Sequence, residues 1–90
     1  MDFQYALTAL KEGLKVERSG WNGKGMFLFL NPGSEVTVSE DRPLASVFPV
    51  GTSCKMLSYI MMKTADPGLV LVPWLASQTD ILADDWSIVR

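Results

Sequence analysis

A tryptophan stands among polar and basic side chains in the segment RSGWNGKG, residues 18–25. The indole of Trp21 offers a flat apolar face on which a planar base can stack. The amide of Asn22 suits base edges and hydroxyls, while Arg18 or Lys24 could place positive charge at a phosphate. These residue types favour a nucleotide-binding site, although glycines around a tryptophan more often mark only a tight turn.

A second tryptophan is followed by a hydroxyl, an amide and a carboxylate. Trp74 precedes Ser77, Gln78 and Asp80 within a few positions. An aromatic face with such polar groups is what a base attached to a ribose needs. The alternative is that Trp21 and Trp74 close the ends of a small core, and the residues leave both interpretations open.

The third tryptophan has a more ordinary explanation. Trp86 precedes Ile88 and Val89, which have the character of core residues. We therefore expect Trp86 to pack inside the fold rather than to face a ligand.

Support for catalysis or metal binding is thin. Histidine is absent, which removes the commonest general base and a frequent metal ligand. Each carboxylate that could replace it has a structural explanation: Asp66 in a turn, Asp80 in a helix cap, Asp84 and Asp85 in a solvated turn. Neither Ser77 nor Cys54 has a local activating partner. The sequence predicts no enzyme, no metal site and no cofactor.

Composition sets the broad class of the protein. Ninety residues make one small domain, and 48% of them are apolar, so we expect part of the apolar surface to be buried in a homo-oligomer. The net charge is −2 without a basic block, which argues against DNA as a partner. Cys54 is the single cysteine, so it cannot form an internal disulfide, and the segment MDFQYALTAL does not have the pattern of a signal peptide. We therefore expect a cytoplasmic protein. The longest apolar run, residues 69–76, is too short to cross a membrane.

The hydrophobic spacing predicts elements that would position these residues. A helix is expected over residues 2–12, with Asp2 as N-cap and Gly13 after its end. Strands are expected at 14–17, 24–30, 35–38, 57–65, 69–74 and 84–89. Asn22 and Gly23 predict a hairpin turn, and Ser77 should cap a short helical turn. The strand after the hairpin turn should be buried on both faces, and a subunit interface could cover one of them. Two prolines argue against regular structure in 43–52. The predicted fold is α+β: a short N-terminal helix packed on an antiparallel sheet of about five strands, in a single domain over residues 1–90.

Three blocks of the sequence resemble those of one family. They are GWNGKGMFLFL at 20–30, YIMMKTAD at 59–66 and VPWLASQTDILADDW at 72–86, after the helical segment FQYALTALKEG. In this order they are similar to the Thoeris anti-defense 2 family of phage proteins, formerly a domain of unknown function. The resemblance covers nearly the whole chain apart from its irregular middle.

The resemblance implies a sponge, meaning a protein that sequesters a signal without cleaving it. The signal is a cyclic ADP-ribose isomer of the glycocyclic type, which a bacterial TIR-domain enzyme makes from NAD after infection. Its capture in the cytoplasm of the infected host silences an NAD-depleting effector and so blocks Thoeris immunity. The resemblance also implies a homotetramer with ligand pockets between subunits, and some family members bind cyclic oligonucleotides.

Carried onto this chain, the resemblance implies roles for residues of its two most specific blocks. Trp21 or Trp74 would stack on adenine, and Asn22, Gln78 and Asp80 would contact base edges and ribose hydroxyls, with Ser77 beside them. The chain departs from the family pattern in a longer segment between Asp66 and Trp74, and residues 43–57 match no known pattern. Two alternatives remain. One is a small enzyme that cleaves such nucleotides, for which Asp80, beside Ser77 and Gln78, is the candidate catalytic group. The other is an adaptor that binds another protein through exposed tryptophans.

Overall fold

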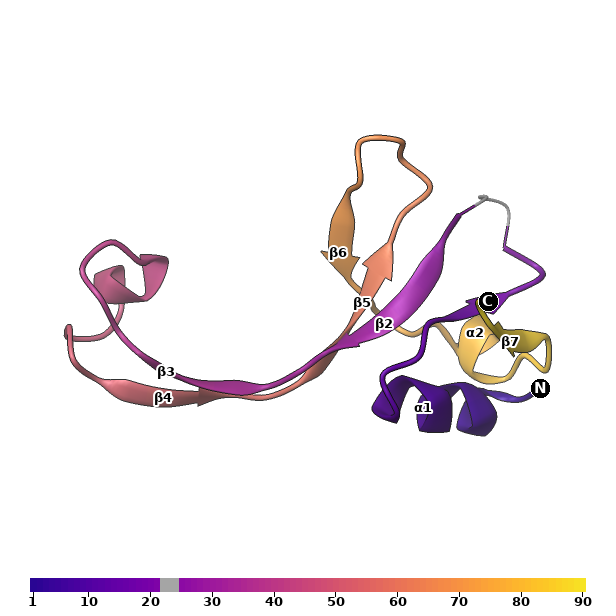
Figure 1. Cartoon of the computed structure of the whole chain (residues 1–90), viewed down its shortest axis with the longest axis horizontal. Helices are drawn as coiled ribbons and strands as arrows, with labels where there is room; N and C mark the ends of the chain where they lie inside the picture. Colours follow the sequence, from indigo (N-terminus) through magenta and orange to yellow (C-terminus); the bar gives the residue numbers. More distant parts are fainter. Residues whose placement is uncertain (22–24) are drawn as a thin grey trace.

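The protein has an α+β architecture in the computed structural model, which describes residues 1–21 and 25–90 (Figure 1). Its elements in chain order are α1 (Phe3–Lys11), β1 (Val16–Arg18), β2 (Phe27–Asn31), β3 (Ser34–Thr37), the 3₁₀ helix η1 (Pro43–Ser46), β4 (Ser53–Met56), β5 (Tyr59–Lys63), β6 (Leu71–Pro73), α2 (Gln78–Ile81) and β7 (Trp86–Ile88). Five strands form one antiparallel sheet in the order β6-β5-β2-β1-β7, and β3 pairs with β4 in a second sheet. The predicted fold class is confirmed, whereas the predicted turn at Asn22 and Gly23 lies outside the described residues.

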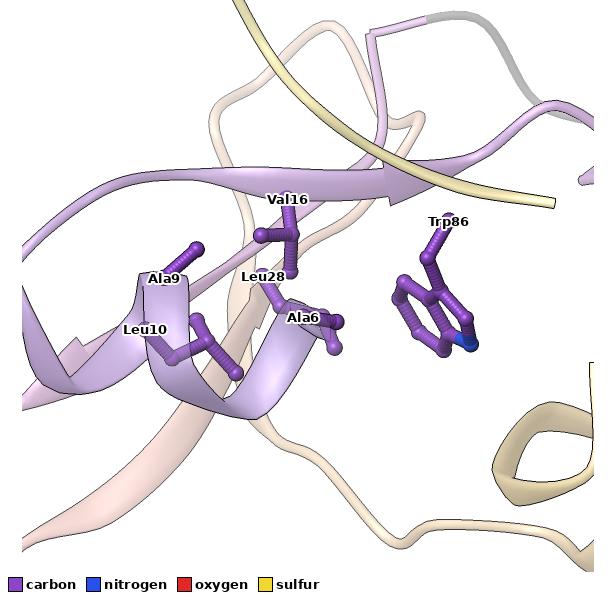
Figure 2. Close-up of a cluster of buried hydrophobic side chains, with 6 residues drawn as sticks. All are labelled: Ala6, Ala9, Leu10, Val16, Leu28 and Trp86. Carbon is purple, nitrogen blue, oxygen red and sulfur yellow. The ribbon is translucent and has the colours of Figure 1, made fainter. Parts of the chain in front are cut away.

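Helix α1 supplies one side of the core. Asp2 caps its first turn, since the Asp2 carboxylate accepts a hydrogen bond of 2.9 Å from the backbone N–H of Tyr5. Gly13 follows its end at a φ of +86°, a conformation that glycine adopts without strain. The main cluster of buried side chains comes from this helix, β1, β2 and β7, and it consists of Ala6, Ala9, Leu10, Val16, Leu28 and Trp86 (Figure 2). The core therefore lies where α1 crosses the β2-β1-β7 side of the sheet.

A long two-stranded ribbon leaves this body (Figure 1). Asn31 of β2 faces Tyr59 of β5, and Ser34 of β3 faces Met56 of β4, so the register continues unbroken from one sheet into the other. Pro32 interrupts the ladder because proline has no backbone N–H to donate. At the neighbouring Gly33 a Cβ would lie 2.5 Å from the carbonyl oxygen of Met56, so the close approach of the two strands requires glycine. We call residues 32–58 the arm.

The arm makes the single chain extended. The Cα radius of gyration of the chain is 16.0 Å, whereas a compact domain of this length has about 12 Å. Side chains of the arm are correspondingly exposed, among them Val47, Phe48 and Leu57. The chain by itself leaves apolar surface uncovered, as the composition predicted.

The middle of the chain differs from expectation in two places. Irregular structure is predicted for residues 43–52 and is found in 47–52, but Pro43 opens the 3₁₀ helix η1, a position that its fixed φ favours. Strand β4 was not expected, and its segment Ser53–Met56 is short and mostly exposed. It forms through its backbone pairing with β3.

The burial expected on both faces of the strand after the predicted hairpin turn is met only in part in the single chain, and burial of one face against another subunit stays a prediction. Within β2 only Leu28 is buried, and its neighbours are half-buried. Pro73 lies on the edge strand β6. No helix in the described residues, 1–21 and 25–90, has the length and apolar character needed to cross a membrane.

Candidate functional site

The three tryptophans meet in one cluster, with Trp86 at its centre. Trp86 is 1% exposed, which confirms the prediction that it belongs to the core. Trp21 stands nearly perpendicular to it, at 83° with 5.4 Å between ring centroids, and Trp74 does so at 85° and 6.1 Å. Phe3 of α1 packs against Trp74 and Trp86. Trp21 and Trp74 are half-buried and pack against the core, so each residue stays partly accessible to solvent.

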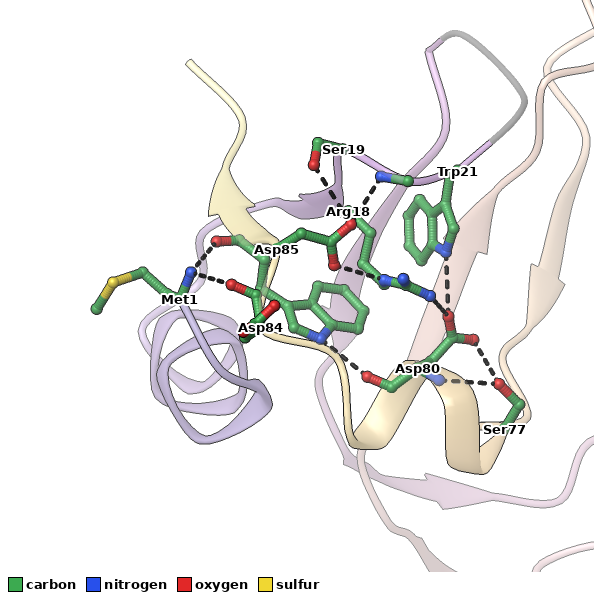
Figure 3. A network of polar contacts seen from close by, with 10 residues as sticks. Met1, Arg18, Ser19, Trp21, Ser77, Asp80, Asp84 and Asp85 are labelled. Carbon is green, nitrogen blue, oxygen red and sulfur yellow. Dashed lines mark hydrogen bonds and ion pairs between the residues drawn. The ribbon is translucent and has the colours of Figure 1, made fainter.

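Helix α2 places Asp80 beneath this cluster. Ser77 caps the helix as predicted: its hydroxyl accepts from the backbone N–H of Asp80 at 3.1 Å and donates to the Asp80 carboxylate at 3.0 Å. The same carboxylate accepts the indole N–H of Trp21 at 3.2 Å, and the backbone carbonyl of Asp80 accepts that of Trp86 at 2.9 Å (Figure 3). Asp80 thus links two of the three tryptophans.

A guanidinium between two carboxylates completes the network. Nη1 of Arg18 lies 2.6 Å from Oδ1 of Asp80, and Nε of Arg18 lies 2.7 Å from Oδ1 of Asp85 (Figure 3). The three side chains are only 15%, 16% and 25% exposed, respectively, so solvent screens these ion pairs less than it would a surface pair. The expectation that Asp85 belongs to a solvated turn is wrong, because Arg18 holds it at the network. Asp84, its neighbour, is exposed as expected.

Hydrogen bonding fixes the charge state of the network. Burial alone would raise the pKa of Asp80, but hydrogen bonds from Arg18, Trp21 and Ser77 outweigh it and lower that pKa below its ordinary value. The hydrogen bond from Arg18 likewise lowers the pKa of Asp85, and Asp85 in turn does most to raise the pKa of Arg18. Two carboxylates and one guanidinium are therefore ionised near neutral pH, and the network carries a net negative charge.

These pKa shifts predict that the network is lost in acid. Both carboxylates have folded-state pKa values below their unfolded ones. Their contribution is complete above the unfolded value of about 4 and is lost as the pH falls through the lower folded values. We expect the melting temperature to fall on acidification below about pH 4, and to fall less steeply in an Arg18→Gln variant, measured by circular dichroism. Equal slopes for the two proteins would contradict the prediction.

The structure brings together five of the eight residues proposed from the sequence: Arg18, Trp21, Trp74, Ser77 and Asp80. Gln78 lies on α2 and is exposed. Asn22 and Lys24 lie outside the described residues, so their predicted roles stay predictions. The phosphate contact proposed for Arg18 also stays a prediction, and its two ion pairs weigh against it because its charge is already balanced.

A groove opens beside Trp74, between α1 and the end of β5. Its volume is about 480 Å³, and Phe3, Leu10, Leu30 and Ile60 supply much of its apolar lining. Tyr59 adds a second aromatic ring, and Lys11 adds a cation. Trp74 therefore faces a space large enough for a planar group. Within residues 1–21 and 25–90, no group of His, Cys, Asp and Glu side chains is arranged to hold a metal ion.

Comparison with known proteins gives two matches. Residues 1–89 match the family described as Tad2-like, the Thoeris anti-defense 2-like domain. The protein named Thoeris anti-defense 2 of Bacillus phage SP01 is 46% identical over 94 residues, which cover 99% of this chain and 94% of that protein. Both matches extend over the helix, the sheets and the tryptophan cluster.

Proposed function

Because the chain belongs to the Thoeris anti-defense 2-like family, as the resemblance of its sequence blocks predicted, we propose that it inhibits Thoeris immunity on behalf of a phage. It does so as a sponge: it binds a cyclic ADP-ribose isomer of the glycocyclic type and holds it without cleaving it. It acts where a TIR-domain enzyme makes that signal, in the cytoplasm of the infected bacterium. Cyclic oligonucleotides are a second class of ligand for the same protein.

The tryptophan cluster is the observation that carries this proposal. Trp21 and Trp74 are partly exposed and pack edge-on against the buried Trp86. A fixed ring binds a planar base at a lower entropic cost than a ring that must be ordered on binding. Such preorganisation suits a sponge, because the signal must be captured at low concentration.

The charge state of the carboxylates favours binding over hydrolysis. A general base works best with a pKa near the working pH, yet the pKa values of Asp80 and Asp85 are lowered. Both side chains are also occupied by hydrogen bonds from Arg18. The lowered pKa and the occupied carboxylate oxygens weigh against Asp80 as the general base of a nucleotide-cleaving enzyme.

We propose that the functional form is a homo-oligomer, a tetramer with ligand pockets between subunits. The exposed apolar side chains of the arm and of the β5–β6 loop, including Phe48, Leu57 and Leu69, support it because burying them against other copies is favourable. Light scattering should give a mass of about four times the 9.9 kDa of one chain. A monomeric mass at micromolar concentration would remove the intersubunit pocket from the proposal.

Release of the ligand by heat tests the sponge directly against the alternatives. The protein is incubated with a glycocyclic ADP-ribose isomer, washed and heat-denatured, and the supernatant is analysed by mass spectrometry. The proposal predicts the intact cyclic nucleotide, whereas a linear or hydrolysed product would indicate an enzyme. If no nucleotide is retained but a polypeptide partner is, the adaptor interpretation replaces the sponge.

A further inference from the structure

We propose that Asp85 is a positioning residue of the ligand site, which holds Trp21 in place without touching the ligand itself. The ligand in this inference rests on the proposed function above. The geometric part does not, because it follows from contacts between Asp85 and the segment that carries Trp21 (Figure 3).

The first route from Asp85 to Trp21 runs along the backbone. Oδ2 of Asp85 accepts the backbone N–H of Gly20 at 2.7 Å and the hydroxyl of Ser19 at 3.3 Å. The backbone carbonyl of Asp85 accepts the N–H of Ser19 at 3.2 Å. A Cβ on Gly20 would lie 2.9 Å from Oδ2 of Asp85, so the glycine permits this approach. Asp85 thereby fixes the turn from which Trp21 emerges.

The second route runs through the guanidinium. Oδ1 of Asp85 holds Nε of Arg18, and this orients Nη1 toward Asp80. Oδ1 of Asp80 accepts both that Nη1 and the indole N–H of Trp21. A planar guanidinium held at two points has a fixed orientation. Removing the charge of Asp85 would leave Arg18 paired on one side only.

Both carboxylate oxygens of Asp85 are already engaged by the protein. Oδ1 accepts from Arg18, and Oδ2 accepts from Ser19 and Gly20. The residue therefore acts on the site through Trp21. Asp84 carries the same charge one position earlier but is exposed, so it provides a matched control.

Asp85→Asn and Asp84→Asn are compared by calorimetric titration with a glycocyclic ADP-ribose isomer, at a temperature where far-ultraviolet circular dichroism shows both variants folded. We expect Asp85→Asn to weaken binding roughly tenfold and Asp84→Asn to leave it within about twofold. In a Trp21→Ala background, Asp85→Asn should have little further effect, because the ring that it positions is gone. Arg18→Lys is the second variant if Asp85→Asn does not fold. It keeps the charge but loses the two-point contact, and should weaken binding similarly.

Two outcomes would overturn the positioning role: unchanged affinity in a folded Asp85→Asn protein, or an equally large loss when Trp21 is already absent. If the wild-type protein binds no nucleotide, the proposed function fails. A ligand-free measurement then decides whether Asp85 positions Trp21. The near-ultraviolet circular dichroism of the Trp21–Trp86 pair must then change in Asp85→Asn and not in Asp84→Asn. An unchanged spectrum in Asp85→Asn would overturn the inference.

Discussion

Replacing Trp86 by alanine should cost about 3–5 kcal/mol of the free energy of unfolding. Its side chain is 1% exposed and lies in contact with Phe3, Trp21 and Trp74, so truncation leaves a cavity at the centre of the aromatic cluster. It also removes the indole N–H that the backbone carbonyl of Asp80 accepts. Small domains have only about 5–15 kcal/mol of stability in all, so the variant should unfold far more readily than the wild type.

Chemical denaturation followed by circular dichroism measures this loss. Trp86→Phe keeps an aromatic ring but no donor, and should cost less than Trp86→Ala. Leu75→Ala is the control, because Leu75 is 91% exposed in the single chain and should lose little by truncation. A Trp86→Ala protein as stable as Leu75→Ala would contradict the packing described above.

Replacing Trp21 by alanine should instead act mainly on the ligand. Stacking of one base on an aromatic ring contributes about 1–3 kcal/mol by truncation, which corresponds to a roughly ten- to hundredfold weaker affinity. Trp21 is half-buried and its indole N–H is engaged by Asp80, so a base would contact the part of the residue that remains accessible. The stability loss should be smaller than that of Trp86→Ala.

Calorimetric titration and thermal melts on the same Trp21→Ala and Trp74→Ala proteins separate the two roles. A residue that stacks on the ligand loses affinity with a modest change in melting temperature. A residue that only closes the core loses stability and keeps its affinity in the folded state. If Trp21→Ala loses stability but keeps its affinity, Trp21 does not stack on the ligand. Trp74 is then the remaining candidate for stacking.

The sequence predicted the elements whose signals are local. Asp2 and Gly13 mark the two ends of α1, and the apolar spacing between them marks its buried face. Ser77 likewise predicts α2 through its cap. Such signals depend on residues three or four positions apart, so they can be read without knowing the fold.

The sequence could not predict features that depend on strand register. Arg18 of β1 faces Trp86 of β7, and this pairing brings Asp85 beside Arg18 although the two are far apart in the chain. Taken alone, two successive aspartates have the composition of an exposed turn. Strand β4 was not predicted for a similar reason. It is short and mostly exposed, and it forms through backbone pairing with β3.

Calorimetric titration of the wild-type protein with a glycocyclic ADP-ribose isomer tests the proposed sponge function. We expect saturable, tight binding, with the nucleotide recovered unaltered after the titration. Absence of binding, both to this isomer and to cyclic di- and trinucleotides, would contradict it.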